Sequence, residues 1–160
     1  MIEILEANPL NPVHAKAIVQ LLDEYAREPM GGGQPLSEAV KTNLPMALSK
    51  RSNAYVILAL DGNKPAGLTI CFEGFSTFAC RPLLNIHDVM VSARYRGQGI
   101  SKRLLEQAEV IARRLDCCKL TLEVLEGNSI AQSAYRSVGF DSYQLDPTRG
   151  RALFWEKKLG

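Results

Sequence analysis

The residues with the clearest chemical meaning form the run 94–101, Arg-Tyr-Arg-Gly-Gln-Gly-Ile-Ser. It follows an apolar, strand-like segment that ends at Val91 and precedes a segment of helical periodicity that begins at Ile100. A strand, a glycine turn and a helix N-terminus together form an anion site. Backbone N–H groups of the first helical turn have no partner within the helix, and the helix dipole favours negative charge there. Glycines allow close approach of the ligand, and arginines suit phosphate oxygens, so the run predicts a bound phosphate.

Two common phosphate-binding motifs do not fit this run. A P-loop would end in Gly-Lys-Ser/Thr, whereas Gly99 is followed by Ile100 and Ser101. A dinucleotide fingerprint needs a third glycine, and Lys102 stands in its place. The phosphate is therefore held by another kind of loop.

The elements that must position this loop follow from hydrophobic periodicity. The pattern predicts helices over 13–25, 37–48, 100–115 and 129–138, and strands near 2–5, over 55–60, 65–72, 83–91 and 119–125, near 143 and over 152–157. Helix 100–115 joins strands 83–91 and 119–125 as a parallel β-α-β unit, and antiparallel hairpins surround it. The order predicts a mixed α/β fold.

Size and composition narrow the class of protein. The 160 residues fit one domain, 1–160, and a formal charge of +2 argues against a nucleic-acid-coating protein. No apolar run reaches membrane-spanning length, and the N-terminus lacks the features of a signal peptide. The four cysteines show no zinc-site spacing, so we expect no metal and reduced thiols in a cytoplasmic protein.

Two patterns together resemble a known family. The loop reads Arg94-x-x-Gly97-x-Gly99, and a second signature, Asn-x-x-Ala-x-x-x-Tyr-x-x-x-Gly-Phe, runs from Asn128 to Phe140. Both are similar to signatures of the GNAT superfamily of N-acetyltransferases. The resemblance implies that family's fold, with a central mixed, mostly antiparallel sheet of about seven strands, one parallel pair and about four helices.

The resemblance also implies acetyl-CoA as the acetyl donor. Its pyrophosphate would lie on the loop amides, which belong here to Arg96, Gly97, Gln98, Gly99, Ile100 and Ser101. Its pantetheine arm would follow the strand backbone at Val89, Met90 and Val91, where unpaired backbone groups can receive an amide-bearing ligand. Asn128 matches a family asparagine that contacts the pantetheine, although it also suits a simple helix N-cap.

Two residues are candidates for the chemistry. Tyr135 matches the family tyrosine near the donor sulfur, where a phenol can protonate the departing thiolate; otherwise it is a core aromatic. His87 is our candidate base, because strand alternation predicts that it shares a face with Asn85, Val89 and Val91 and because its ordinary pKa lies near neutrality. Asp88 or a water relay are the alternatives.

The acceptor side is less defined by the sequence. Family substrates enter over segments that correspond to 25–35 and 73–81, where we expect Tyr25, Met30, Gly31, Gly32 and Phe75 to contact the acceptor. An excess of acidic residues over residues 1–40 would favour a cationic amine.

We therefore expect direct acetyl transfer to a primary amine of a small molecule. The alternatives are acetylation of a protein N-terminus or lysine, and a non-catalytic acyl-CoA-binding module. Family members often form homodimers, but nothing in the sequence identifies an interface.

Overall fold

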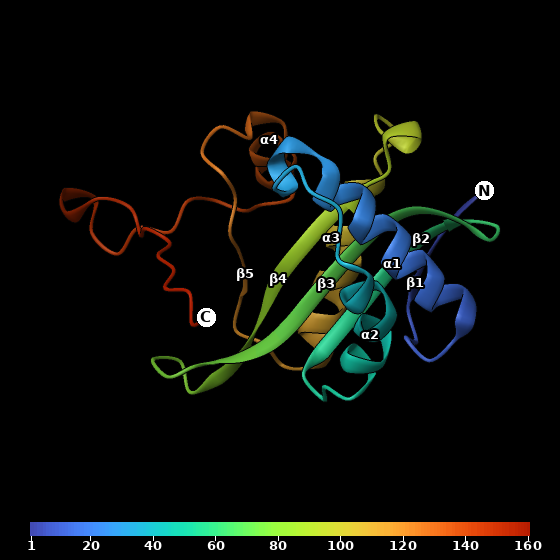
Figure 1. Ribbon diagram of the computed structural model, residues 1–160. Helices are drawn as coiled ribbons and strands as arrows, with labels where there is room; N and C mark the ends of the chain where they lie inside the picture. Colours follow the sequence, from blue (N-terminus) through green and yellow to red (C-terminus); the bar gives the residue numbers. More distant parts are fainter.

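The computed structural model describes residues 1–160 and contains one sheet with the strand order β1-β2-β3-β4-β5 (Figure 1). Its strands are β1 (Ile2–Glu6), β2 (Ala54–Asp61), β3 (Lys64–Ser76), β4 (Arg81–Val91) and β5 (Leu120–Leu122). Its helices are α1 (Pro12–Arg27), α2 (Glu38–Ser49), α3 (Ile100–Arg114) and α4 (Ser129–Ser137), with 3₁₀ turns at η1 (Pro29–Gly31), η2 (Ala93–Tyr95) and η3 (Pro147–Arg149). The predicted mixed α/β architecture is confirmed.

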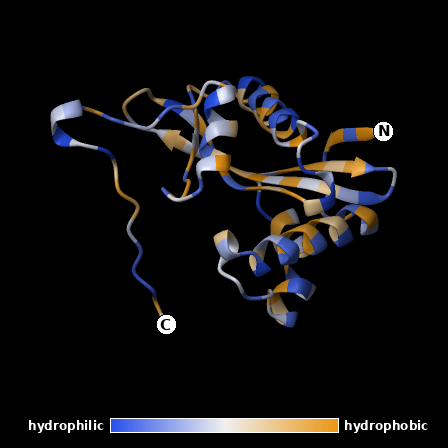
Figure 2. Ribbon diagram, turned by 90° about the horizontal axis from the view of Figure 1, so that it is seen from above, coloured by the Kyte–Doolittle hydropathy of each residue, from blue (hydrophilic) through white to orange (hydrophobic).

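Helices cover both faces of the sheet, as the edge-on view shows (Figure 2). Alternate residues of the continuous apolar run Val56–Leu60 therefore enter two different cores. Ile57 and Ala59 pack with α3, whereas Val56, Leu58 and Leu60 pack with α1 and α2. Burying such aliphatic side chains contributes about 1.5–3 kcal/mol each, and this fixes the sheet between its two helical layers.

Helix α3 is the best-packed helix of the site region because its apolar side chains recur with helical spacing. These side chains make up half of the buried core between the sheet and α3, which we call the α3-side core; the core on the opposite face is the α1-side core. They are Ile100, Leu104, Leu105, Ala108, Ile111 and Ala112. Close approach to the sheet depends on Gly67 of β3, where a Cβ would lie 3.0 Å from Leu104 Cδ1 and 3.1 Å from the Met90 carbonyl oxygen. The start of α3 is thus held firmly against β3 and β4.

Strand β4 contains a bulge at His87. The residue Ile70 of β3 pairs with Asp88, and the next residue, Cys71, pairs with Ile86, so His87 has no partner on β3. An extra residue in a strand reverses the alternation of side chains and backbone groups beyond it. The segment after His87 is therefore turned over relative to the segment before it.

Strand β5 pairs with β4 in parallel over only three residues, from Leu84 opposite Leu120 to Ile86 opposite Leu122. This confirms the predicted parallel pair, although β5 is shorter than predicted. Beyond Ile86 the chain of β5 leaves the sheet, and the outer edge of β4 faces no strand.

The prediction of about seven strands is wrong, because residues near 143 and over 152–157 form no strand. A strand needs a neighbouring backbone of sufficient length for its hydrogen bonds, and β5 offers only three residues. The chain after Phe140 instead extends away from the sheet (Figures 1 and 2). Its apolar side chains Leu153, Phe154 and Trp155 are exposed.

Candidate active site

The glycine loop has the geometry of an anion site. Gly97 and Gly99 both adopt positive φ angles, 76° and 73°, and Gly99 is the N-cap of α3 without any side-chain cap. Within the protein no hydrogen bond uses the N–H groups of the loop and first helical turn, which belong to Gly97, Gln98, Gly99, Ile100, Ser101 and Lys102. These donors lie at the start of α3, where the helix dipole is positive, so the loop is suited to the predicted phosphate.

The bulge decides which backbone groups reach the open edge of β4. Before it, the Pro82 carbonyl and the Leu84 N–H engage the β5 side, whereas after it the Ser92 N–H engages Ala66 of β3. The backbone groups of Val89 and Val91 consequently point to the open edge, and those of Met90 point to β3. The Val91 carbonyl oxygen already accepts a bond of 3.1 Å from Arg96 Nε, in agreement with this orientation.

Each residue of the second signature has a local structural role in α4. Asn128 caps the helix by accepting from the Ala131 N–H at 3.1 Å. Gly139 has a φ of 95°, and the bonds from the Gly139 and Phe140 N–H groups to Arg136 and Tyr135 carbonyls end the helix in a left-handed turn. Phe140 then packs edge-on against the Tyr135 ring, with centroids 6.2 Å apart. The spacing of the signature therefore fixes the orientation of Tyr135.

Tyr135 lies on α4, close to Tyr25 at the end of α1. Its ring packs against the core on the α3 side of the sheet. Its pKa is raised first by burial and then by Tyr25, which packs against the core on the α1 side, so Tyr135 is near both sides of the sheet. The pKa of Tyr25 is raised by burial and then by the charges of Asp88 and Glu28. Tyr135, Tyr25 and Asp88 thus lie near one another, at α4, the end of α1 and β4.

The bulge changes the predicted arrangement of His87. The prediction that His87 shares a face with Val89 and Val91 is wrong, because those valines pack against the α3-side core. His87 instead contacts Phe72, which belongs to the α1 side, at 5.5 Å between ring centroids. Asp88 lies on this side too, as its effect on Tyr25 indicates. Strand alternation alone could not reveal this, since the extra residue places both side chains on one face.

Asp88 has no hydrogen bond or ion pair to another side chain. Burial raises the pKa of its carboxyl, and the neighbouring His87 opposes this shift in part. His87 is exposed. The site therefore combines a poorly solvated carboxylate with an imidazole that is open to solvent.

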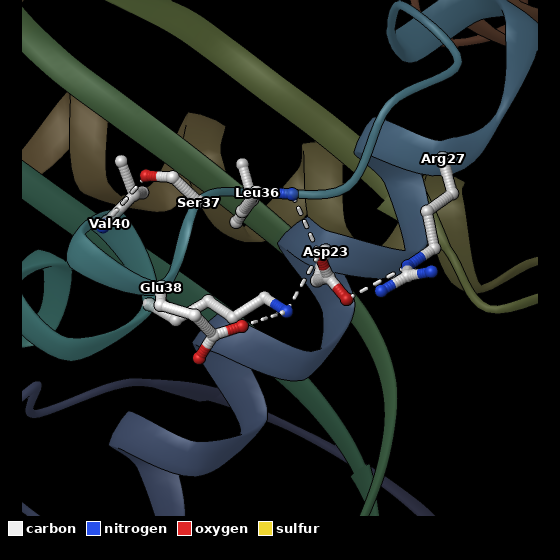
Figure 3. A network of polar contacts seen from close by, with 7 residues as sticks. Asp23, Arg27, Leu36, Ser37, Glu38 and Val40 are labelled. Carbon is white, nitrogen blue, oxygen red and sulfur yellow. Dashed lines mark hydrogen bonds and ion pairs between the residues drawn. The ribbon is translucent and has the colours of Figure 1, made fainter.

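The loop between α1 and α2 is folded onto α1 rather than loosely connected. Asp23 holds it, because its carboxylate accepts from the Leu36 N–H at 2.8 Å and from Arg27 Nε at 3.0 Å and lies 3.6 Å from Lys41 Nζ (Figure 3). These bonds outweigh desolvation and hold the pKa of Asp23 below its usual range. Gly31 is required at this bend, since a Cβ there would lie 2.0 Å from the Tyr25 carbonyl oxygen.

The predicted acceptor residues are only partly brought together. Gly31 lies against Tyr25, Met30 precedes it in η1 and is exposed, and Gly32 caps the end of η1. Phe75 pairs with Pro82 near the end of the β3–β4 hairpin, five strand residues, or roughly 16 Å, from His87. Phe75 is therefore not beside the other predicted acceptor residues.

Two carboxylates, one on α1 and one at its end, tie the glycine loop to α1, a contact that the sequence analysis did not predict. Glu24 accepts from the Ala93 N–H at 3.0 Å, and Glu28 pairs with Arg96. The remaining acids of the N-terminal region are largely paired as well, in the contacts Glu6–Arg114, Asp23–Arg27 and Glu38–Lys41. Partners separated by 69 residues, as Glu24 and Ala93 are, leave no local sequence signal.

The comparisons with known proteins agree with this geometry. The model of the acetyltransferase (GNAT) family matches residues 15–140, so the chain belongs to that family. The predicted resemblance is confirmed. No helix of the chain combines the length and apolar character needed to cross a membrane.

Among curated proteins, the chain is 36% identical over 95 residues to a streptothricin acetyltransferase from Streptomyces lavendulae, covering 59% of this chain and 48% of that protein. It is 30% identical over 73 residues to a thialysine N-epsilon-acetyltransferase from Bos taurus, covering 46% and 42%. The matched segments span less than half the length of these relatives.

Solved structures are similar over nearly the whole chain. An aminoglycoside acetyltransferase from an uncultured soil metagenomic sample, in complex with sisomicin, has a TM-score of 0.79 and 18% identity and covers 99% of this chain and 97% of its own. An aminoglycoside N-acetyltransferase in complex with CoA has a TM-score of 0.75 and 15% identity and covers 99% and 96%. At these identities the likeness establishes the fold.

Proposed function

We propose that this protein transfers the acetyl group of acetyl-CoA directly to a primary amine of a small molecule. One observation carries the proposal. The open edge of β4 begins at a bulge beside Tyr25 and Tyr135 and ends at a loop of unpartnered amides. An extended donor with a phosphate at one end and a thioester at the other fits such an edge. Family membership supports the same chemistry.

The donor would be held by backbone groups. The amides of Gly97 to Ser101 suit its pyrophosphate, and the outward backbone groups of Val89 and Val91 suit its pantetheine amides. Arg96 lies between the two groups of backbone donors and acceptors, because its side chain donates to the Val91 carbonyl and pairs with Glu28. Asn128 orders the start of α4 and remains a proposed pantetheine contact.

Tyr135 would act as the general acid. Its raised pKa keeps the phenol protonated at neutral pH, so it can donate a proton to the thiolate that leaves when the amine attacks the thioester carbon. The proton lost by the amine must go elsewhere. His87 would accept it and release it to solvent, to which its side chain is exposed.

Asp88 would attract the acceptor. It is a half-buried carboxylate without an ion pair beside Tyr25, and an ammonium group entering this space would restore the solvation that the carboxylate lacks. The named substrates of the relatives, streptothricin and thialysine, support a small amine as the acceptor class.

Exchange of Tyr135 for phenylalanine tests the proposal. We expect Tyr135→Phe to lower kcat by about 100-fold or more while the Kd of acetyl-CoA stays within about twofold, because only the proton donor is lost. Thiol release from acetyl-CoA measures kcat, and calorimetry measures the Kd. Tyr55→Phe is the matched control, since Tyr55 is also half-buried with a raised pKa but lies on β2. Unchanged turnover would exclude Tyr135 as the acid.

The acceptor class is tested with the wild-type protein on small amines and on peptides with free N-termini or lysines. Turnover of small amines supports the proposal, turnover of peptides alone indicates a protein acetyltransferase, and binding of acetyl-CoA without any turnover indicates a binding module.

The acidic limb of the pH–rate profile identifies the base. It should disappear in His87→Ala, and its loss in Asp88→Asn alone would move the role to Asp88.

A further inference from the structure

A groove of about 900 Å³ adjoins the start of the glycine loop at Arg94. One wall is a single face of α1, which includes Lys16 and Glu24. The other walls are the β2–β3 turn with Lys64 and the η2 segment with Arg94. The groove adjoins β3, whereas the open edge of β4 lies on the β5 side. It is therefore separate from the path proposed for the pantetheine arm.

The groove carries an uncompensated positive charge. The side chains of Lys16, Lys64 and Arg94 are exposed, and none of them takes part in an ion pair or a hydrogen bond. Most other arginines of the folded body are paired. Three unpaired cations from three separate segments thus face one groove, and they repel each other unless an anion joins them.

The acidic groups nearby do not supply that anion. Glu24, the one carboxylate in the lining, is held by the Ala93 N–H at 3.0 Å. Asp61 is paired with the N-terminal ammonium at 3.1 Å and accepts from the Tyr95 hydroxyl at 3.4 Å, and it makes no ion pair with Lys64. All three cations are exposed to solvent and open to a ligand.

We propose that this groove binds a phosphate-bearing anion through Lys16, Lys64 and Arg94. An arginine presents a planar fork to phosphate oxygens, and two lysines add point charges on the opposite walls. The volume is within the range of small-molecule sites and exceeds what a single inorganic ion requires. The same charge repels the ammonium of an acceptor. The anion is either the 3′-phosphate of the donor or a phosphorylated small molecule that binds independently.

The test uses a groove variant, Lys16→Gln/Lys64→Gln/Arg94→Gln. The control variant, Lys50→Gln/Arg51→Gln/Lys158→Gln, removes the same charge from exposed cations that also lack ion pairs and lie elsewhere. Thermal unfolding verifies that both fold. Calorimetry then measures the affinity of tripolyphosphate, with and without saturating CoA, and the affinities of CoA and 3′-dephospho-CoA.

We expect the groove variant to bind tripolyphosphate at least about fivefold more weakly than the control variant, with a loss that shrinks at high salt. If this loss persists with CoA bound, the anion is an independent ligand. If CoA abolishes tripolyphosphate binding and the groove variant no longer prefers CoA over 3′-dephospho-CoA, the anion is the donor's 3′-phosphate. Equal affinities of the two variants for every probe would overturn the proposal, whatever the outcome for acetyl transfer.

Discussion

At the scale of single residues, the bulge at His87 determines which side chains enter the site. It brings His87 and Asp88 to the α1 side and turns the backbone of Val89 and Val91 toward the open edge. Tyr135 is set by different means, through the cap at Asn128 and the packing of Phe140. The proposed donor side and the proposed acceptor side are thus positioned by independent local features.

Asp88 carries a stability cost that depends on pH. Burial raises the pKa of Asp88 in the folded protein above its value in the unfolded chain, so folding is favoured when the carboxyl is neutral. This contribution to the free energy of unfolding is fully present below the unfolded pKa, and it is lost as the pH rises through the folded pKa. We therefore expect Asp88→Asn to raise the urea midpoint of unfolding at pH 7, with a smaller gain near pH 4, while acetyl transfer falls.

Asp23 gives the contrast, because its folded pKa is lowered. Asp23→Asn should lower the urea midpoint at pH 7, since the stabilisation by the Asp23 carboxylate is present above the unfolded pKa and is lost on acidification.

The Asp88 prediction has an opposite outcome that would contradict it. An Asp88→Asn variant with a lower urea midpoint at pH 7 would show that Asp88 is paired in the folded protein.

At the scale of elements, the β4–loop–α3 unit forms the proposed phosphate end of the site. Gly99 must take a left-handed conformation to start α3 where it does, and the close contacts at Gly67 fix α3 against the sheet. The loop amides consequently hold their direction without a ligand. The loop after α1 is likewise tied down, by Asp23, so both sides of the site are supported by folded segments.

Gly99→Ala should separate folding from binding. A left-handed alanine costs about 1 kcal/mol of unfolding free energy, and its Cβ at the loop should weaken acetyl-CoA binding by about tenfold. Gly62→Ala is the matched control, because Gly62 has a φ of 60° in the β2–β3 turn and a Cβ there also meets open space. It should lose similar stability in urea and keep the wild-type Kd. Equal Kd values for both variants would argue against the loop as the phosphate site.

At the scale of the whole molecule, the proposed donor would join α3, β4 and α4, three elements that otherwise meet through a short β5. A ligand that binds only the folded state stabilises it in proportion to the logarithm of its concentration. Acetyl-CoA at about 100 times its Kd should add about 2.7 kcal/mol and raise the Tm of a chain of this size by roughly 5–10 °C.

Differential scanning calorimetry over a series of acetyl-CoA concentrations measures this shift, with 3′-dephospho-CoA and free acetate as comparison ligands. Acetate, which lacks the pyrophosphate and the pantetheine, should leave the Tm unchanged. A Tm that acetyl-CoA does not alter would contradict its proposed binding to the folded chain.

The sequence by itself determined the local parts of this protein. The glycine loop, the cap, tyrosine and closing glycine of α4, the helices and the parallel strand pair could all be predicted, because each depends on residues within one or two turns of each other or on simple periodicity. These local patterns also sufficed for the family. Whether residues near 143 and over 152–157 form strands could not be predicted in this way, since a strand exists only where a neighbouring backbone pairs with it through hydrogen bonds.

Only the tertiary structure decided how the parts meet. The bulge at His87 arises from pairing with β3, and it reversed the predicted faces of β4. The contacts of Glu24 and Glu28 with the loop, and the gathering of Lys16, Lys64 and Arg94 around one groove, join segments that are far apart in the chain. Such juxtapositions depend on packing of the whole sheet, for which the local sequence carries no signal. The glycine turn and helix start at 94–101 could therefore be predicted from the sequence, whereas the surroundings of this loop could not.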